Sequence, residues 1–302
     1  MRASAEKRPA PGEPRGPDAS VGPDVVDTAD GSRTLRSGAH GQTFKSRLGA
    51  LTESRSVFLE GSGVAARLAA GEPTCLLEIG FGTGLNFLVT AEAARVAGTK
   101  VHYVAVETDL LPAATLRALA YHEALAPSPF PTAFVEWRAG LEEEEAAPEP
   151  GRVSGARRHR WGVGPIMLDL VVGNVLVDRT WELLLAFGGS GHGLGFGAGV
   201  DASVGTDVDV GVDVGFEAGF DVGFDAIYHD AFSPSVAPEL WSPAFLARLA
   251  SALAPGGRLV SYSVAGAVRR ALADAGLEVR KVPGPPGGKA EVLVATRPGQ
   301  RP

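Results

Sequence analysis

The chain has 302 residues, of which 45% are apolar and 21% charged, so it is long and apolar enough to bury a sizeable core. Its one cysteine, Cys75, excludes an intramolecular disulfide and any multi-cysteine metal site, and it fits a reducing compartment. No apolar run reaches the length of a membrane span, and no export signal follows the first basic residues. We therefore expect a soluble, cytoplasmic protein that does not contact a membrane. The net charge of −7 does not exclude a nucleic-acid partner, because six of the acidic residues lie between positions 188 and 224.

Two segments lack the periodicity of folded elements. Residues 1–28 are rich in Pro, Gly, Ala and charge, which predicts a disordered tail ahead of a single domain at 29–302. Within that domain, a Gly/Val/Asp/Phe run at about 188–224 predicts a flexible low-complexity insertion. Its alternating Asp and Gly residues suggest a calcium-binding repeat, but the required nine-residue spacing is missing. We therefore expect no metal.

The rest of the chain predicts strands alternating with helices. A helical pattern ends near Gly71 and is followed by strand Cys75–Ile79, helix Leu85–Val96, strand Val101–Val106, helix Leu110–Leu125, strand Phe134–Arg138, an exposed excursion Glu142–Arg160, strand Ile166–Val172 and a helix around Asp178–Phe187. Beyond the insertion come strand Phe224–His229, helix Pro243–Leu253, the turn Ala254–Gly257, strand Arg258–Ser263, helix Ala265–Ala275 and strands Leu277–Val282 and Glu291–Thr296. This order predicts a doubly wound α/β fold with a mostly parallel sheet, and the last two strands predict an antiparallel hairpin at one edge.

A glycine turn, Glu78-Ile79-Gly80-Phe81-Gly82-Thr83-Gly84, joins the first of these strands to the first helix, where doubly wound sheets bind nucleotides. Its glycines let the backbone approach a ligand closely and offer N–H groups at a helix start. Such a turn can also be purely structural. Two carboxylates strengthen the binding interpretation: Glu78 is placed to reach the amino group of a methionine moiety, and Glu107 can accept from both ribose hydroxyls.

The two acidic residues would suit NAD as well as S-adenosylmethionine. The Gly-x-Gly-x-Gly spacing differs from the Gly-x-Gly-x-x-Gly of dinucleotide sites, and Leu253-Ala254-Pro255-Gly256-Gly257-Arg258-Leu259 resembles a turn found in many methyltransferases. These features favour S-adenosylmethionine as cofactor and the class I methyltransferase type of fold. Asn174, after the strand that ends at Val172, either contacts the adenine amino group or belongs to an ordinary surface turn.

Asp230 is the candidate catalytic residue. It ends a predicted strand at the carboxyl edge of the sheet, and a carboxylate there can orient an amine nucleophile and help to remove its proton. The alternative is a structural cap for the next loop. Phe232 and Trp241 can stack on a base or simply pack, with packing favoured for Trp241. His229 faces away from Asp230 in a regular strand and is not expected to be catalytic.

The glycine turn, with Leu77 before it and Leu85-Asn86-Phe87-Leu88 after it, resembles the MnmC-type methyltransferase domain together with Phe224-Asp225-Ala226-Ile227-Tyr228-His229-Asp230-Ala231-Phe232-Ser233-Pro234. So do Asp30–Leu35, Gly49–Ser54, Pro238–Trp241 and the stretch from Leu253 to Gly276. At Phe44-Lys45-Ser46 the chain differs from the Tyr-His-Ser or Tyr-Tyr-Ser of that family. Many relatives carry a fused flavin-dependent oxidase, and the absence of a second glycine-rich turn predicts a stand-alone methyltransferase.

The resemblance implies methyl transfer from S-adenosylmethionine to the 5-aminomethyl group of the wobble uridine in tRNA, with the anticodon region as partner. The residues expected to bind the cofactor are Glu78, Gly80, Phe81, Gly82, Thr83, Gly84, Asn86, Glu107 and Asn174. Asp230 would lie beside the amine, and Phe232, Pro234 and Ser46 are expected to contact the substrate.

Two other functions stay open: methyl or aminopropyl transfer to a small amine, and cofactor binding without catalysis. A tRNA substrate needs a basic surface near the pocket, although each basic residue by itself can equally be a solvated charge. The candidates are Arg33, Arg36, Lys45, Arg47, Arg157, Arg158, Arg160, Arg269 and Arg270.

Overall fold

The computed structural model describes residues 24–146, 155–187 and 223–299. Most of the predicted tail and of the predicted insertion, residues 1–23 and 188–222, lies outside the described residues. The predicted end of the tail at residue 28 is wrong, because Asp24–Asp27 form strand β1. This strand pairs antiparallel with β2, Arg33–Arg36, so the ordered chain begins earlier than its composition indicates.

The described residues contain an eight-stranded sheet in the order β5-β6-β4-β3-β7-β8-β10-β9. Its strands are β3 (Thr74–Ile79), β4 (Val101–Glu107), β5 (Arg157–Val163), β6 (Ile166–Val172), β7 (Phe224–His229), β8 (Leu253–Ser261), β9 (Glu278–Pro283) and β10 (Glu291–Thr296). The five strands from β6 to β8 are parallel, and β10 with β9 forms the predicted antiparallel hairpin at one edge. At the other edge β5 pairs antiparallel with β6, which the sequence did not predict.

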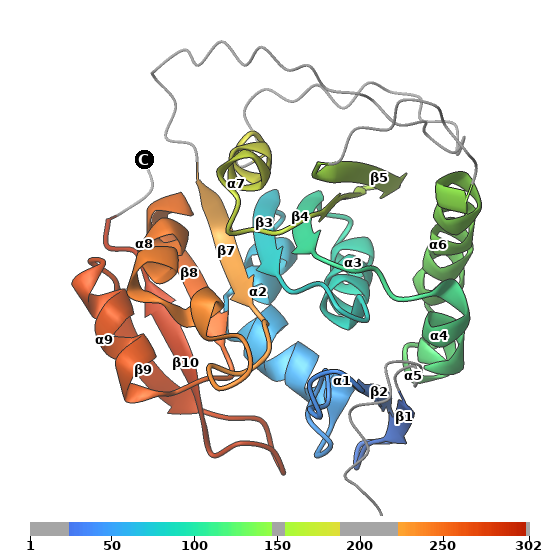
Figure 1. The fold of residues 1–302 in the computed structure, drawn as a ribbon, viewed down its shortest axis with the longest axis horizontal. Coiled ribbons are helices and arrows are strands. Elements are labelled where there is room, and N and C mark those ends of the chain that lie inside the picture. Colours follow the sequence, from blue (N-terminus) through green and yellow to red (C-terminus); the bar gives the residue numbers. More distant parts are fainter. Residues whose placement is uncertain (1–23, 147–154, 188–222, 300–302) are drawn as a thin grey trace, which may run out of the picture.

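Helices cover both faces of the sheet (Figure 1). One layer contains α1 (Ala50–Glu53), η1 (Ser54–Glu60), α2 (Val64–Ala69), α3 (Leu85–Ala97), α4 (Ala113–Ala118), α5 (Tyr121–Ala124) and α6 (Phe130–Ala146). The other contains α7 (Asp178–Leu185), η2 (Pro238–Trp241), α8 (Pro243–Ala252) and α9 (Gly266–Asp274). Strand β3 shows why two cores form: Leu76 packs into one hydrophobic cluster and its neighbour Leu77 into the other. Because successive side chains of a strand point to opposite faces, a fully buried strand serves both layers.

The structure corrects four predicted elements. The predicted strand Phe134–Arg138 is part of helix α6, where Phe130, Phe134 and Arg138 recur every four residues and are all buried. This helix and β5 also replace the two ends of the predicted excursion Glu142–Arg160.

The predicted helix Leu110–Leu125 is divided into α4 and α5, because Ala120 between them has a positive φ of 50°. The predicted turn Ala254–Gly257 belongs to β8, which already begins at Leu253 and shifts register against β7 between Phe224 and Ala226.

The parallel strands place the predicted site residues at one edge. The backbone N–H of Asp230, just after β7, donates to Ile79 O at the end of β3 (3.0 Å). Gly80 N likewise donates to Val106 O (3.2 Å), and Gly173 N donates to Glu107 O (2.8 Å). The carboxyl ends of β3, β4, β6 and β7 therefore meet, which is where doubly wound sheets bind ligands.

Candidate functional site

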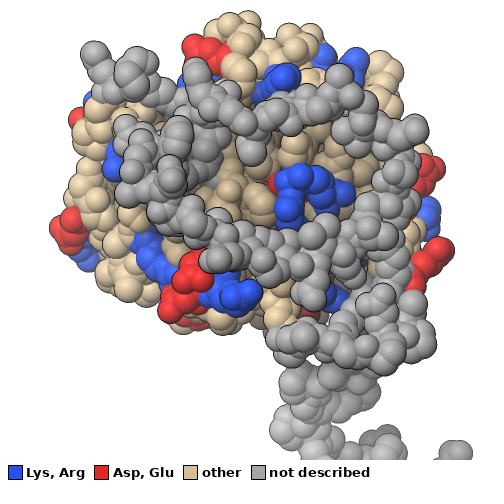
Figure 2. Space-filling model, turned by 90° about the horizontal axis from the view of Figure 1, so that it is seen from above, with Lys and Arg blue, Asp and Glu red and all other residues tan. Residues whose placement is uncertain are grey.

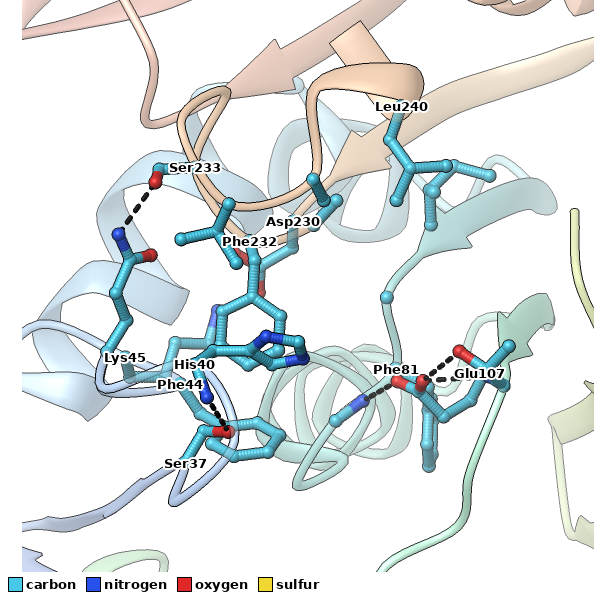
Figure 3. Close-up of a pocket in the computed structure, with 18 of the residues that line it drawn as sticks. Ser37, His40, Phe44, Lys45, Phe81, Glu107, Asp230, Phe232, Ser233 and Leu240 are labelled. Carbon is cyan, nitrogen blue, oxygen red and sulfur yellow. Dashed lines mark hydrogen bonds and ion pairs between the residues drawn. The ribbon is translucent and has the colours of Figure 1, made fainter. Parts of the chain in front are cut away.

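A cavity of about 840 Å³ opens at this edge of the sheet (Figure 3). Its walls come from the glycine turn after β3, the ends of β4, β6 and β7, and the segment 36–47 that follows β2. Figure 3 shows Phe81 and Glu107 on one side of the cavity, and His40, Phe44, Phe232 and Asp230 grouped on the other. One cavity thus receives residues from distant parts of the chain.

The glycine turn has a backbone that only glycine tolerates well. Gly80, Gly82 and Gly84 have φ values of 86°, 53° and 74°. A Cβ on Gly80 would lie 3.0 Å from Asp230 O, and one on Gly82 would lie 3.0 Å from Phe44 Cδ1. The turn therefore lets the loop after β7 and the Phe44 ring approach the start of α3. Gly80, Phe81, Gly82 and Thr83 line the cavity, whereas Gly84 is the buried N-cap of α3.

Glu107 joins this turn to the end of β4. Its Oε2 accepts from Gly82 N (2.9 Å) and its Oε1 from Thr108 N (2.8 Å). Burial raises the pKa of Glu107 above its ordinary value, and these backbone N–H donors oppose the rise. A carboxylate fixed by two backbone donors at a cavity wall can accept from vicinal hydroxyls, as the sequence analysis expected.

Glu78 does not line the cavity. Its carboxylate lies behind the turn, where Oε1 accepts from Asn86 Nδ2 (2.7 Å) and Oε2 from Tyr103 OH (2.8 Å). Burial, with a smaller contribution from the nearby Asp230, raises the pKa of Glu78 to about 8. The structure therefore shows Glu78 supporting Asn86 and not exposed to a ligand, and the expected reach to a methionine amino group is not seen.

Asn86 is also buried behind the cavity wall, and it links the glycine-turn side of the site to Asp230. Its Nδ2 donates to Asp230 Oδ2 (2.9 Å) as well as to Glu78, and its Oδ1 accepts from Lys45 Nζ (2.8 Å). The first turn of α3 thus fixes the carboxylate that ends β7.

Lys45 was placed wrongly among the candidate surface cations. Its side chain is 5% exposed, and its ammonium donates to Asp230 Oδ2 as well as to Asn86. Asp230 itself is 6% exposed at its side chain and lines the cavity. Burial raises the pKa of Asp230, and Lys45 is the foremost group that opposes this rise. The only signal in the sequence was the departure at Phe44-Lys45-Ser46, which indicates a difference but not an ion pair.

Glu53, in α1, is a second site residue that the sequence reasoning missed. It lines the cavity, and its Oε1 lies 3.8 Å from Lys45 Nζ. Burial raises the pKa of Glu53 to about 7, while Lys45 lowers it and Asp230 raises it further. Glu53 lies in Gly49–Ser54, a stretch that resembles the family but marks no single residue as functional, and only the packing of α1 against the sheet brings Glu53 to the cavity.

The aromatic residues divide between cavity and core. Phe232 lines the cavity and packs between the His40 ring (centroids 4.6 Å apart) and the Phe44 ring (5.3 Å). Trp241 is buried, donates from Nε1 to Phe232 O (2.7 Å) and packs on His229, in keeping with the favoured packing role. His229 is fully buried with its pKa lowered to about 4 by desolvation, and its Nε2 bonds Leu240 O (3.0 Å).

Of the remaining predicted site residues, Ser46 and Asn174 line the cavity and Pro234 does not. Ser46 lines the cavity, and its Oγ accepts from Leu48 N (3.2 Å). Asn174 is exposed at the cavity mouth, where its Oδ1 accepts from Leu176 N (2.9 Å), so it closes a surface turn. Its Nδ2 has no hydrogen-bond partner in the part of the chain that the structure describes. Pro234 is half-buried outside the lining.

The cationic side chains near the cavity are fewer than predicted. Arg36, Arg47 and Lys289 are exposed and line it. By contrast, Arg158 and Arg160 bind Asp169 in the sheet (2.7 and 2.8 Å). Figure 2 shows the opposite side of the molecule, where α7 lies in Figure 1, and the visible basic side chains there also form separate groups.

Among the described residues, no group of His, Cys, Asp or Glu is arranged to hold a metal ion. None of the helices in the same part of the chain is long and apolar enough to cross a membrane.

Comparison with known proteins agrees with this geometry. Residues 212–298 match a family described as S-adenosyl-L-methionine-dependent methyltransferase. The chain is 35% identical over 268 residues to the tRNA 5-methylaminomethyl-2-thiouridine biosynthesis bifunctional protein MnmC of Pseudomonas aeruginosa (strain UCBPP-PA14), covering 86% of this chain and 33% of the relative. It is 33% identical over 263 residues to the MnmC protein of Aromatoleum aromaticum (strain DSM 19018 / LMG 30748 / EbN1), covering 85% and 33%. The chain therefore spans about a third of the length of these relatives.

A solved structure shares the fold. The crystal structure of MNMC2 from Aquifex aeolicus superposes with a TM-score of 0.61 at 23% identity, covering 94% of this chain and 74% of that one. The predicted fold and the resemblance to MnmC-type proteins are thus confirmed, and residues 212–298 are similar to S-adenosyl-L-methionine-dependent methyltransferases.

Proposed function

We propose that this chain transfers a methyl group from S-adenosylmethionine to the exocyclic primary amine of 5-aminomethyl-2-thiouridine at the wobble position of tRNA. The observation that carries the proposal is that the glycine turn and Asp230 line one cavity. The names of the MnmC relatives support the choice of tRNA as substrate.

The glycine-turn side of the cavity fits the cofactor. A Cβ on Gly80 or Gly82 would touch its neighbours at 3.0 Å, so the backbone stays open to a ligand only with glycine. Glu107 would accept from the ribose hydroxyls, and Asn174 would reach the adenine from the cavity mouth. When bound, S-adenosylmethionine supplies a methyl group that its sulfonium centre has already activated.

Asp230 would act on the acceptor at the other side. Its Oδ2 is held by Asn86 and Lys45, while Oδ1 has no hydrogen-bond partner among the described residues. Oδ1 can therefore accept from the amine, aim its lone pair and take a proton after transfer. Because the methyl group needs no further activation, positioning and exclusion of water supply most of the acceleration. Phe232 and Ser46 would form the wall against the uridine.

The cavity rim suits a polyanion. Arg36, Arg47 and Lys289 stand exposed around it and can contact phosphates. Binding through phosphates predicts an affinity for tRNA that falls steeply as salt is raised.

The test is mass spectrometry of wobble nucleosides from cells that lack this protein. We expect 5-aminomethyl-2-thiouridine to accumulate, and we expect the purified chain with S-adenosylmethionine to convert it in isolated tRNA. An unchanged nucleoside profile together with no conversion in vitro would refute the proposal. Turnover of polyamines would then indicate transfer to a small amine, and cofactor binding without transfer to any amine would indicate a non-catalytic protein.

A further inference from the structure

The ammonium group of Lys45 contacts polar, acidic and aromatic side chains at the cavity wall. Its Nζ donates to Asp230 Oδ2 and to Asn86 Oδ1 (2.8 Å), and it lies 3.8 Å from Glu53 Oε1. The same ammonium lies 4.2 Å from the centroid of the Phe58 ring. Four side chains thus surround this cation, which is only 5% exposed although it lines the cavity.

The ionisation of the carboxyl groups around Lys45, and their contacts with it, indicate that Lys45 is the counter-ion of Asp230. Burial raises the pKa of Glu78 to about 8 and that of Glu53 to about 7, so near neutral pH Glu78 is largely protonated and Glu53 is about half ionised. Asp230 alone among the three shares a direct hydrogen-bonded ion pair with Lys45.

Three further charged or titratable groups lie near the cluster of Lys45, Asp230, Glu53 and Glu78. The charge of Lys289, after β9, lowers the pKa of Glu53. The charges of Asp230 and Glu53 add to the effect of burial in raising the pKa of the Tyr262 phenol, after β8. Tyr103 of β4 donates to Glu78 on the far side. None of these groups is hydrogen-bonded to Asp230 within the described residues, so Lys45 remains its one cationic partner there.

We propose that Lys45 is a positioning residue that serves as the fixed counter-ion of Asp230, so that the acceptor binds as the neutral amine. This inference rests on the proposed function. Lys45 and Asn86 engage Oδ2 and leave Oδ1 for the acceptor. If Asp230 had no cation of its own, an incoming amine would bind as an ammonium, which has no lone pair with which to attack.

The chemical step balances with this assignment. The nitrogen lone pair forms the new N–C bond while the S–C bond of the cofactor breaks, and the sulfur keeps that bonding pair. The methylated nitrogen is then positively charged and loses one proton to Asp230 Oδ1. Lys45 neither gives nor takes a proton in this sequence; it keeps Asp230 ionised and correctly turned until the proton arrives.

The first test compares Lys45→Met and Lys45→Arg with the wild-type chain, measuring kcat on tRNA that carries 5-aminomethyl-2-thiouridine against pH. We expect Lys45→Met to shift the rising limb of the profile upward by about one pH unit or more, because its acceptor binds as an ammonium. Activity should recover at alkaline pH. Lys45→Arg should largely restore the wild-type profile, and Lys281→Met, which removes an exposed lysine paired with Glu291, should leave it unchanged. An unshifted limb in Lys45→Met, whatever the loss of rate, would refute the role.

The second test does not depend on the substrate. Lys45→Met leaves the Asp230 carboxylate buried without its cation, so its melting temperature should fall by about 5 °C or more at pH 8. Asp230→Asn added to Lys45→Met removes the stranded charge and should recover most of that loss. A double variant as unstable as Lys45→Met would mean that the two residues are not a coupled pair. If the wild-type chain fails to methylate tRNA while this recovery is seen, the proposed function fails and the counter-ion pairing stands.

Discussion

Asp230 has one oxygen that accepts two hydrogen bonds and one that has no hydrogen-bond partner among the residues that the structure describes. Asn86 Nδ2 and Lys45 Nζ both donate to Oδ2, so the carboxylate has a fixed orientation at the cavity wall. A cap for the following loop, the structural alternative considered for this residue, would need the carboxylate to accept from nearby backbone N–H groups. The described residues show no such bond. The geometry therefore favours a chemical role.

Asp230→Asn tests that role with the smallest change of shape. We expect the rate of methyl transfer to fall by about 100-fold or more, because the amide cannot take the proton or accept from the amine as a carboxylate does. Cofactor affinity should stay within a few-fold of wild type, since Glu107 and the glycine turn are untouched. Single-turnover transfer and titration calorimetry measure the two quantities. Asp274→Asn, at an exposed position ending α9, is the control, and near wild-type turnover in Asp230→Asn would exclude Asp230 from the chemistry.

Glu107 should act on the cofactor alone. Its carboxylate accepts from Gly82 N and Thr108 N, so it is already oriented at the cavity wall. Glu107→Ala should weaken S-adenosylmethionine binding by about 10- to 100-fold, the range expected when hydrogen bonds to a charged group are lost. At saturating cofactor the rate should change little, because Glu107 lies on the opposite side of the cavity from Asp230 (Figure 3). Unchanged affinity would remove Glu107 from the ribose site.

Elements with strong local signals could be predicted from the sequence. The apolar strand β3, the glycine turn and helix α3 follow one another without interruption, and strand β7 ends at His229, directly before Asp230, as predicted. Helix α6 could not be assigned from Phe134–Arg138 alone, because five residues of mixed polarity fit a strand as well as a helix. The helical period shows only when Phe130 and Leu141, also buried, are included.

Contacts between elements that are distant in the sequence could not be predicted. Lys45 and Glu53 belong to segments with no catalytic motif. Lys45 pairs with Asp230, and Glu53 lies beside Lys45, only because the chain after β2 packs across the end of the sheet. The same packing brings Gln42 Nε2 to within 2.7 Å of Ser233 Oγ, although 191 positions separate the two residues. Without knowledge of other sequences, no local pattern predicts such pairs.

The turn between β3 and α3 allows a matched pair of glycine variants. Gly82 and Gly98 both have left-handed backbones, with φ of 53° and 65°, but a Cβ on Gly82 would meet Phe44 at 3.0 Å whereas Gly98 has open space. Gly82→Ala and Gly98→Ala should each lose about 1–2 kcal/mol of stability through backbone strain. Only Gly82→Ala should also weaken cofactor binding, by displacing Phe44 and reshaping the turn. Equal cofactor affinity in the two variants, measured by calorimetry, would show that the turn does not contact the cofactor.

Across the whole molecule, buried acidic groups gather at the carboxyl edge of the sheet. Glu78 is enclosed among Asn86, Tyr103 and Asp230, and Glu53 lies next to Lys45. A fold optimised only for stability would place apolar groups at these positions, because desolvating a carboxyl group is costly. The molecule thus keeps buried carboxyl groups beside the cavity despite the desolvation cost, as enzymes do where pKa values are tuned for chemistry.

The free-energy cost of burying ionised carboxyl groups should appear in the pH dependence of the free energy of unfolding. The pKa of Glu78 is about 8 in the folded chain against an ordinary value of 4.5, so its favourable contribution is complete below pH 4.5 and is lost as the pH rises toward 8. Glu53 adds a decline in the same direction up to about pH 7. In Glu78→Gln the first decline is absent, so the stability of the variant relative to wild type should rise steadily between pH 5 and pH 8.

Urea unfolding followed by tryptophan fluorescence at several pH values measures this difference. Because the glutamine amide has one acceptor oxygen, Glu78→Gln loses the hydrogen bond from either Asn86 or Tyr103, which adds an offset that does not depend on pH, so only the trend is informative. Glu278→Gln, at an exposed carboxylate of β9, is the control and should show no trend. A constant difference between Glu78→Gln and wild type over this range would mean that Glu78 is ionised in the folded protein, and the protonated hydrogen-bond network behind Asp230 would have to be redrawn.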